Sequence, residues 1–431
     1  MVQKRVGGML ALLVVAFMLS TSTGAASTYK ILYEFKGAPD AGQPLDGLIF
    51  DAAGNLYGTT IGGGAYNVGS VFKLAPNADG SWTESVLYSF YSPTAGKVDG
   101  EAPTARLIFD AAGNLYGTTS VGGESDGGGK CPNGCGTVFK LAPNSDGSWT
   151  ESVLYEFAGV SESTVDGSIP TAGLIFDGAG NLYGTTTSGG LEGGGTVFKL
   201  APNAGGSWTE SVLYTFCSLL NCADGAEPHD SLVFDGGNLY GTTRSGGSTI
   251  CPGGCGTVFK LAPNSDGTWT ESVLHKLQNG RDGAFPSSGV ILDPAGNLYG
   301  TTTEGGILAC NVGCGTVFKL APNSEGGWTE SVIRDFYTSA SPDDRLLTFD
   351  AAGNLYGTTV VGGPVNDGRV FKLAPQPGGG WAYSVLRYFY GEPAASPTGN
   401  LVIDKAGNLY GVTESCGNGY SCQGLVFEIT P

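Results

Sequence analysis

Histidine, charged side chains and long apolar runs are all scarce in this chain of 431 residues. The two histidines are too few for a metal site built from several histidine ligands. Charged residues make up 14% of the chain, against roughly 25% in ordinary globular domains. Acidic residues outnumber basic ones by 39 to 21, for a formal net charge of −18. We therefore expect no nucleic-acid partner, because phosphate binding requires a basic surface.

Glycine is abundant, with 74 residues, and proline adds 22 more. Hydrophobic residues still make up 41% and aromatic residues 10% of the chain, which is enough for a packed core. No long segment shows helical periodicity, and glycine is too frequent for helices. The composition therefore predicts a turn-rich, all-β fold.

The first residues are typical of an export signal. Lys4 and Arg5 precede an apolar run from Met9 to Leu19, and small residues follow up to Ser27. We expect residues 1–26 to be a cleaved signal peptide. The run is shorter than the ~20 residues of a membrane span, although an uncleaved anchor remains the alternative. The mature protein is then expected to be secreted or periplasmic, without a membrane span.

One sequence unit is repeated seven times. The segment Asp51–Thr60, with the sequence DAAGNLYGTT, recurs with few changes along the chain, and its copies are 54 to 67 residues apart. Such periods are typical of solenoids and propellers. The Tyr-Gly pairs of the unit begin at Tyr57, Tyr116, Tyr183, Tyr240, Tyr299, Tyr356 and Tyr410.

Each unit predicts four antiparallel strands. In the second unit these are Leu107–Asp110, Asn114–Thr119, Gly136–Leu141 and Trp149–Phe157. Glycine- and asparagine-rich hairpins connect strand one to strand two and strand three to strand four. A long glycine-rich loop connects strand two to strand three.

The two ends of the chain are expected to complete one blade together. The last unit stops after its third strand, Gly424–Ile429, whereas Tyr29–Phe35 matches a fourth strand that has no other strands before it. The sequence thus predicts a closed, seven-bladed β-propeller in one domain, residues 27–431. A closed ring leaves only short, protected edges, and we expect a monomer. The six tryptophans, each just after a second hairpin, are Trp82, Trp149, Trp208, Trp269, Trp328 and Trp381.

The repeated unit D-x-x-G-N-L-Y-G-T-T, followed by G-T-V-F-K-L, resembles the GloVer tandem-repeat family of secreted bacterial proteins. The resemblance covers almost all of the mature chain and implies an extracytoplasmic protein, but no reaction. Members often carry a C-terminal sorting anchor, whereas this chain stops at the end of a strand. The unit is also similar, at the level of fold, to NHL-type and virginiamycin-lyase-type propellers, which implies that strand one is innermost.

The loops divide the expected disc into two unlike faces. The hairpins lie on one face and hardly change between copies. The loops between strands two and three, and the links between blades, lie on the other face and vary widely. We call these the hairpin face and the variable face. Loops held by a rigid scaffold often carry function, so the variable face is the expected working surface; tolerated drift is the alternative.

The ten cysteines form five close pairs on the variable face. In an exported protein such local pairs predict disulfides. No Cys-x-x-Cys motif occurs, and we expect no metal site. The pairs are Cys131 with Cys135, Cys217 with Cys222, Cys251 with Cys255, Cys310 with Cys314, and Cys416 with Cys422.

The mouth of the central channel is the candidate ligand site. Its side chains could bind a sugar, a cation or an anionic group, or they could be solvated strand starts. The Asp-Gly steps just upstream are expected to be turns rather than cation ligands. No cofactor is predicted. The candidate residues are Asp46, Arg106, His229, Asp230, Asp343, Asp344, Arg345 and Asn400.

Three classes of function fit the sequence. The favoured one is a secreted binding module that holds a glycan or a protein ligand on the variable face. A propeller hydrolase or lyase with a metal-assisted site at the channel mouth is the second, and a structural envelope protein is the third. An enzyme is less favoured, because no Ser/His/Asp or paired-glutamate constellation stands out.

Overall fold

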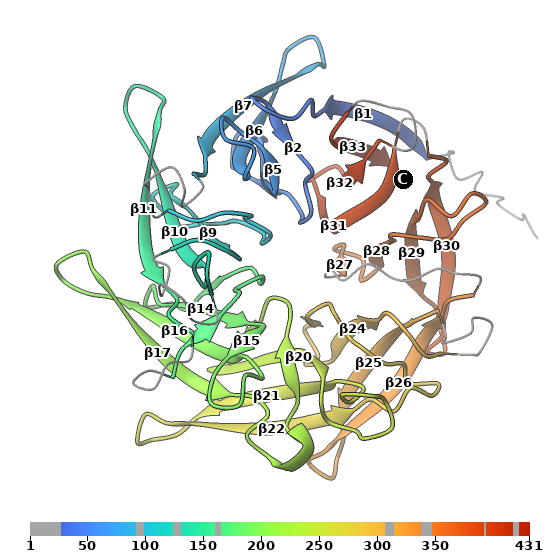
Figure 1. Ribbon diagram of the computed structural model, residues 1–431. Helices are drawn as coiled ribbons and strands as arrows, with labels where there is room; N and C mark the ends of the chain where they lie inside the picture. Colours follow the sequence, from blue (N-terminus) through green and yellow to red (C-terminus); the bar gives the residue numbers. More distant parts are fainter. Residues whose placement is uncertain are drawn as a thin grey trace, which may run out of the picture.

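The computed structural model describes residues 27–91, 99–123, 131–159, 165–306, 314–337, 347–391, 394–416 and 422–431. They form seven antiparallel sheets arranged as blades around a central axis (Figure 1). The predicted all-β, seven-bladed propeller is therefore confirmed. The single helical turn among these residues is η2 (Leu220–Cys222), in a link between blades.

Each blade runs from an inner strand at the axis to an outer strand at the rim. Blade 1 contains β3 (Ile49–Phe50), β4 (Leu56–Thr60), β6 (Ser70–Pro76) and β7 (Trp82–Ser89). Blade 2 contains β8 (Ile108–Phe109), β9 (Leu115–Thr119), β10 (Thr137–Pro143) and β11 (Trp149–Glu156). Blade 3 contains β13 (Ile175–Phe176), β14 (Leu182–Thr186), β16 (Thr196–Pro202) and β17 (Trp208–Thr215). Blade 4 contains β18 (Ala226–Pro228), β19 (Val233–Asp235), β20 (Asn238–Ser245), β21 (Thr257–Pro263) and β22 (Trp269–Lys276).

The remaining blades follow the same order. Blade 5 contains β23 (Ile291–Leu292), β24 (Leu298–Thr302), β25 (Thr316–Pro322) and β26 (Trp328–Asp335). Blade 6 contains β27 (Thr348–Phe349), β28 (Leu355–Thr359), β29 (Arg369–Pro375) and β30 (Trp381–Tyr388). Blade 7 contains β31 (Ala395–Ile403), β32 (Leu409–Ser415), β33 (Leu425–Thr430) and β1 (Thr28–Glu34).

Two details differ from the expected blade. The inner strands of five blades have only two residues, because the aspartate that follows each of them already belongs to the hairpin. On the variable face, links between blades pair with the loops that follow strand two. This adds β2 (Ala41–Gly42) with β5 (Gly62–Gly63), and β12 (Gly167–Ser168) with β15 (Ser188–Gly189).

The first hairpin is held by its aspartate. The Asp51 carboxylate accepts bonds from the backbone amides of Ala53 and Asn55, from the Asn55 side chain at 2.6 Å and from the Tyr57 hydroxyl at 3.0 Å. Burial raises the pKa of Asp51, but these bonds outweigh it, so that the pKa is lowered. The same bonds recur in every blade except blade 4, whose hairpin is one residue shorter.

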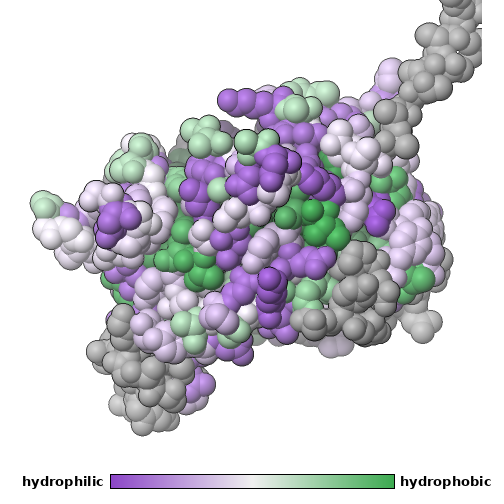
Figure 2. Space-filling model, turned by 90° about the horizontal axis from the view of Figure 1, so that it is seen from above, coloured by the Kyte–Doolittle hydropathy of each residue, from purple (hydrophilic) through white to green (hydrophobic). Residues whose placement is uncertain are grey.

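The core is divided into clusters that each lie between two neighbouring blades. Between blades 1 and 2, for example, Tyr57 and Phe90 pack against Leu115 and Phe139. Phe139 crosses its own blade at Gly117, where an added Cβ would lie 2.7 Å from the ring. The glycine of the repeated Tyr-Gly pair is therefore required by close packing. Seen from the rim, the disc shows hydrophobic residues in small, separate groups among hydrophilic ones (Figure 2).

The tryptophans occupy equivalent places, half-buried at the start of the outer strands. Trp149 meets Tyr57 of the preceding blade, with 6.4 Å between ring centroids and an edge-to-face angle of 67°. The other five tryptophans repeat this contact at 6.0 to 6.4 Å. Trp82 reaches Tyr410 of blade 7 in this way and so helps to close the ring.

The N-terminal strand completes blade 7, as predicted. β1 pairs antiparallel with β33, from Thr28 opposite Thr430 to Glu34 opposite Leu425. Phe35, which is fully buried, meets the ring of Phe72 in blade 1 at 4.9 Å.

Carboxyl groups face one another at five of the junctions between blades. Between blades 2 and 3, the link residue Asp166 accepts a bond from the Tyr155 hydroxyl at 3.0 Å. Glu210 of β17 lies beside this pair; burial, followed by the charge of Asp166, raises its pKa to about 8. Burial and the equivalent aspartates raise the pKa of Glu84 and of Glu271 to about 7. The link aspartates therefore do more than form turns.

We predict that β1 is required for ring closure. Deleting residues 27–35 leaves the edge of β33 unpaired and exposes the core between blades 7 and 1. We expect aggregation, or a melting temperature lower by more than about 10 °C, in calorimetry and size-exclusion chromatography. Lys30→Ala, an exposed change on the same strand, should leave both measurements unchanged. A monomeric deletion variant with the original melting temperature would contradict ring closure.

We also predict that stability falls as the pH rises through 7 to 8. The pKa values of the junction glutamates are raised above the ordinary 4.5, so the stability they contribute at acidic pH is lost when they ionise in the folded state. We expect the melting temperature to be about 3–5 °C higher at pH 6 than at pH 8. Glu210→Gln should reduce this difference, whereas the exposed Glu192→Gln should not. Equal melting temperatures at the two pH values would refute the prediction.

Candidate functional site

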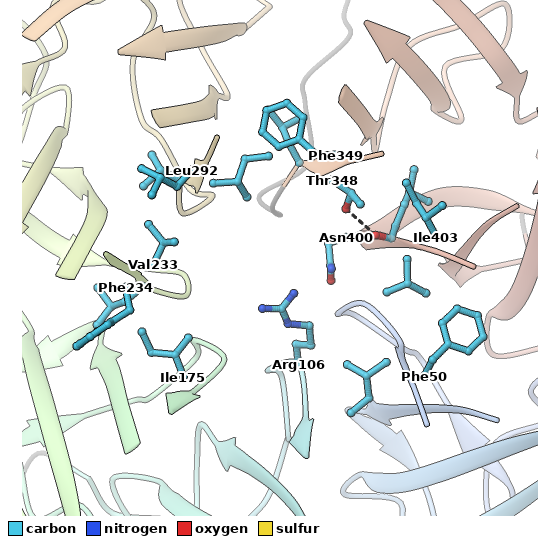
Figure 3. Close-up of a pocket in the computed structure, with 17 residues that line it drawn as sticks. Phe50, Arg106, Ile175, Val233, Phe234, Leu292, Thr348, Phe349, Asn400 and Ile403 are labelled. Atoms are coloured by element: carbon cyan, nitrogen blue, oxygen red, sulfur yellow. Dashed lines mark hydrogen bonds between the residues drawn. The ribbon is translucent and has the colours of Figure 1, made fainter. Parts of the chain in front are cut away.

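The inner strands of the blades surround a central cavity of about 690 Å³. Its wall consists mainly of the apolar side chains of these strands, such as Val233, Phe234 and Leu292 (Figure 3). Arg106, Thr348 and Asn400 are the polar residues among those that line it. The Thr348 hydroxyl donates to the Leu401 carbonyl at 2.6 Å. The described cavity is therefore an apolar space into which two polar groups extend, the guanidinium of Arg106 and the side-chain amide of Asn400.

Arg106 and Asn400 mark the end of the cavity on the variable face. Each directly precedes the buried leucine that leads into an inner strand, and each replaces a small residue found there in other blades, such as Gly173 or Ser231. The two side chains point toward each other across the opening (Figure 3). Among the described residues no carboxylate forms an ion pair with the half-buried Arg106.

Asn400 occupies space that is open only because its neighbour in blade 1 is glycine. A Cβ added at Gly47 would lie 1.7 Å from Asn400 Oδ1. The pairing of a large residue in one blade with a glycine in the next therefore fixes the shape of this opening.

Asp46 and Asp230 lie behind the opening and bind backbone. The Asp46 carboxylate accepts bonds from the amides of Gly47 at 2.6 Å and of Arg106, in the next blade, at 2.7 Å. Asp230 in the same way accepts from Ser231 and from Gly289 of blade 5, the latter at 3.0 Å. Both aspartates are 5% exposed and neither lines the cavity. Each of these aspartates therefore holds the neighbouring blade in place. The sequence shows only a charged residue before an inner strand, and that position alone does not indicate this role.

The other candidates are not brought to the cavity wall by the described structure. His229 is half-buried, and its carbonyl accepts a bond from the Thr171 hydroxyl at 3.3 Å. Asp343, Asp344 and Arg345 lie outside the described residues. In the part of the chain that is described, no three His, Cys, Asp or Glu side chains are grouped so that they could hold a metal ion.

Disulfides are present on the variable face, where the sequence placed them. Those between Cys131 and Cys135 and between Cys251 and Cys255 have the same Cα separation of 5.1 Å. Cys217 is bonded to Cys222, and Cys416 to Cys422. Cys314 is also disulfide-bonded, but Cys310 lies outside the described residues.

The disulfide-bonded loops contact the link to the next blade. The Cys135 carbonyl accepts a bond from the amide of Ile169 at 2.8 Å, and the Cys255 carbonyl accepts one from Phe285 at 2.8 Å. These two disulfides thus shape loops that in turn hold the neighbouring links. Bonds of this kind fit an oxidising compartment.

Exposed apolar side chains gather on the variable face. Among the described residues, every large hydrophobic side chain that is mainly exposed lies in a loop or link on this face, and none lies in a hairpin. Tyr66 and Tyr91, for instance, stack with 4.1 Å between ring centroids. These side chains are Tyr66, Val165, Ile169, Leu191, Leu219, Leu220, Ile250, Tyr337, Val365 and Tyr390.

None of the helical structure in the described residues is long and apolar enough to cross a bilayer.

A solved structure shows the same fold in another protein. An ulvan lyase, described as a new family of polysaccharide lyase, matches over 93% of this chain and 95% of its own, with 12% identity and a TM-score of 0.58 in a complex with -[GlcA(1-4)Rha3S]- and 0.59 without it. A gluconolactonase from Xanthomonas campestris matches over 77% of this chain and 87% of its own, with 15% identity and a TM-score of 0.41. At 12% identity the likeness to the ulvan lyase extends to the fold alone, and no conclusion is drawn from the gluconolactonase.

No curated protein matches the chain. The model of the Gloeobacter/Verrucomicrobia repeat, in contrast, matches residues 15–129 and 128–336, well over half of the chain. The repeated unit that forms the blades is thus the unit of that family, and the chain belongs to the Gloeobacter/Verrucomicrobia repeat family.

Proposed function

We propose that this protein is an exported binding module that holds a glycan at the opening of the central cavity on the variable face. The observation that carries the proposal is Arg106, a guanidinium without an ion pair among the described residues, at the mouth of an apolar cavity of about 690 Å³. Arginine pairs well with carboxylate and sulfate groups, so an acidic sugar fits best. Asn400 adds an amide donor and acceptor.

The surroundings of the opening support binding. The variable face carries the exposed apolar side chains and the disulfide-bonded loops, which would contact the ligand beyond the cavity. Asp46 helps to position Arg106, because its carboxylate accepts a hydrogen bond from the Arg106 backbone amide. The disulfides and the N-terminal sequence favour a location outside the cytoplasm, secreted or periplasmic. A monomer suffices for this function.

A lyase or hydrolase is the second candidate. The fold shared with an ulvan lyase over nearly the full length of both chains favours it. The described lining of the cavity, however, contains no His, Tyr, Lys, Asp or Glu side chain that could transfer a proton. We therefore place binding first; turnover of an acidic polysaccharide by the purified protein would reverse the order.

We predict that Arg106→Gln weakens binding of an acidic glycan by about 10- to 100-fold, as expected for the loss of one charge-assisted hydrogen bond. A glycan array identifies the ligand, and titration calorimetry measures the affinity. Lys405→Gln, which removes one exposed positive charge from a hairpin, is the matched control and should bind normally. Equal affinities for all three proteins, or binding to neutral glycans alone, would refute the site.

A further inference from the structure

The junction between blades 5 and 6 differs from the five junctions with facing carboxyl groups. At those junctions an outer-strand tyrosine or histidine meets a link aspartate and a glutamate of the next blade. Here Arg334 takes the place of the tyrosine, opposite Val317, and Tyr383 takes the place of the glutamate, opposite Leu373. Among the described residues of this junction, the acidic cluster is thus replaced by a basic one; the link, residues 338–346, lies outside them.

A second arginine enters the same junction from strand three. Arg369 is the first residue of β29, where blades 2 to 5 have a threonine. In blade 2, this threonine, Thr137, shares a hydrogen bond of 2.8 Å with Thr119. Arg369 is only 8% exposed, and its Nε donates weakly to Thr359 Oγ1, at 3.4 Å.

The two guanidinium groups lie close to Tyr383. Arg334 Cζ is 3.9 Å from the centroid of the Tyr383 ring. Arg369 Cζ is 5.8 Å from the centroid of the Phe336 ring, which in turn packs edge-on against Tyr383 with 6.3 Å between ring centroids. Burial raises the pKa of Tyr383, and the charges of Arg369 and Arg334 act against this rise. Neither arginine forms an ion pair with a described carboxylate.

Three donor groups of this cluster are buried without an acceptor. They are Arg334 Nε and Arg369 Nη2, which have no hydrogen-bond partner in the structure, and the Tyr383 hydroxyl, which donates to no acceptor and has only the Arg369 guanidinium beside it. A buried donor, and above all a buried charge, is costly unless it is paired. The cluster therefore has both the charge and the unused donors that an anion would satisfy.

We propose that the junction between blades 5 and 6 is a binding site for a small oxyanion, sulfate or phosphate, either free or as an ester group of a larger ligand. Two guanidinium groups and a hydroxyl match the several oxygens of such an ion. Arg334 is half-buried, and the ring of Tyr337, 41% exposed, lies 5.7 Å from its guanidinium, so the cluster is open to solvent beside it. The site lies on β26, β29 and β30 (Figure 1), apart from the cavity lining, and is independent of the proposed function.

The next junction, between blades 6 and 7, provides a control within the same molecule. Arg387 lies 4.2 Å from the centroid of the Tyr29 ring, and its Nε also lacks a partner. The position of Arg369, however, is occupied there by Leu425. With one guanidinium instead of two, this junction should bind an oxyanion far more weakly.

The test uses sodium sulfate with the whole mature protein. At equal ionic strength, sulfate but not chloride should raise the melting temperature, by about 2 °C at ten times the dissociation constant, and calorimetry should give one site. Arg369→Thr, which restores the residue of four other blades, should fold and lose this effect. Arg387→Gln should keep it. If Arg369→Thr does not fold, Arg334→Tyr, the residue at this position in four other blades, serves instead.

Dextran sulfate, with neutral dextran as its control, distinguishes the source of the anion. Binding of dextran sulfate that depends on Arg369 indicates an ester group on a larger ligand, whereas binding of inorganic sulfate alone indicates a free ion. A sulfate effect equal to that of chloride, or one that persists in Arg369→Thr, would overturn the proposal.

Discussion

Packing between neighbouring blades is the interaction on which the rest of this structure depends. Each blade is apolar on both of its faces, and each hydrophobic cluster joins residues of two blades, as Tyr57 and Phe139 do. A single blade therefore has no core of its own, and an open row of blades would leave two apolar faces in water. Only a closed ring buries them all, which is why β1 must lie beside β33.

The blades and their closure could be predicted from the sequence because the residues that form the first hairpin and the second strand of a blade recur seven times. Asp51, Asn55 and Tyr57 define one hairpin, and six further copies remove the ambiguity of a single short motif. The candidate site could be predicted only in part, because there the copies differ by single residues. Arg106 and Asp46 both lie just before an inner strand, but the Arg106 side chain lines the cavity whereas the Asp46 carboxylate binds backbone amides. Which of these two roles a side chain takes depends on the positions of the neighbouring blades.

The polar residues between the blades vary as sets. Where the outer strand carries Tyr155, the link carries Asp166 and the next blade carries Glu210; where it carries Arg334, the next blade carries Tyr383. Exchange of one member alone would leave a buried charge without its partner. The polar contacts between blades are therefore specific to each junction, although the apolar contacts are almost the same at all of them.

The pairing of β1 with β33 also has a consequence for how the molecule is made. Thr28 and Thr430 lie at opposite ends of the sequence, so the first strand to be synthesised has no partner until the last one exists. Throughout synthesis, the backbone of β1 remains unpaired, as does the ring of Tyr29, which packs against Phe389 and Phe427. The ring of blades therefore cannot close by stages from its N-terminus. The architecture favours a chain whose ring closes in one late step, after the last strand has been made.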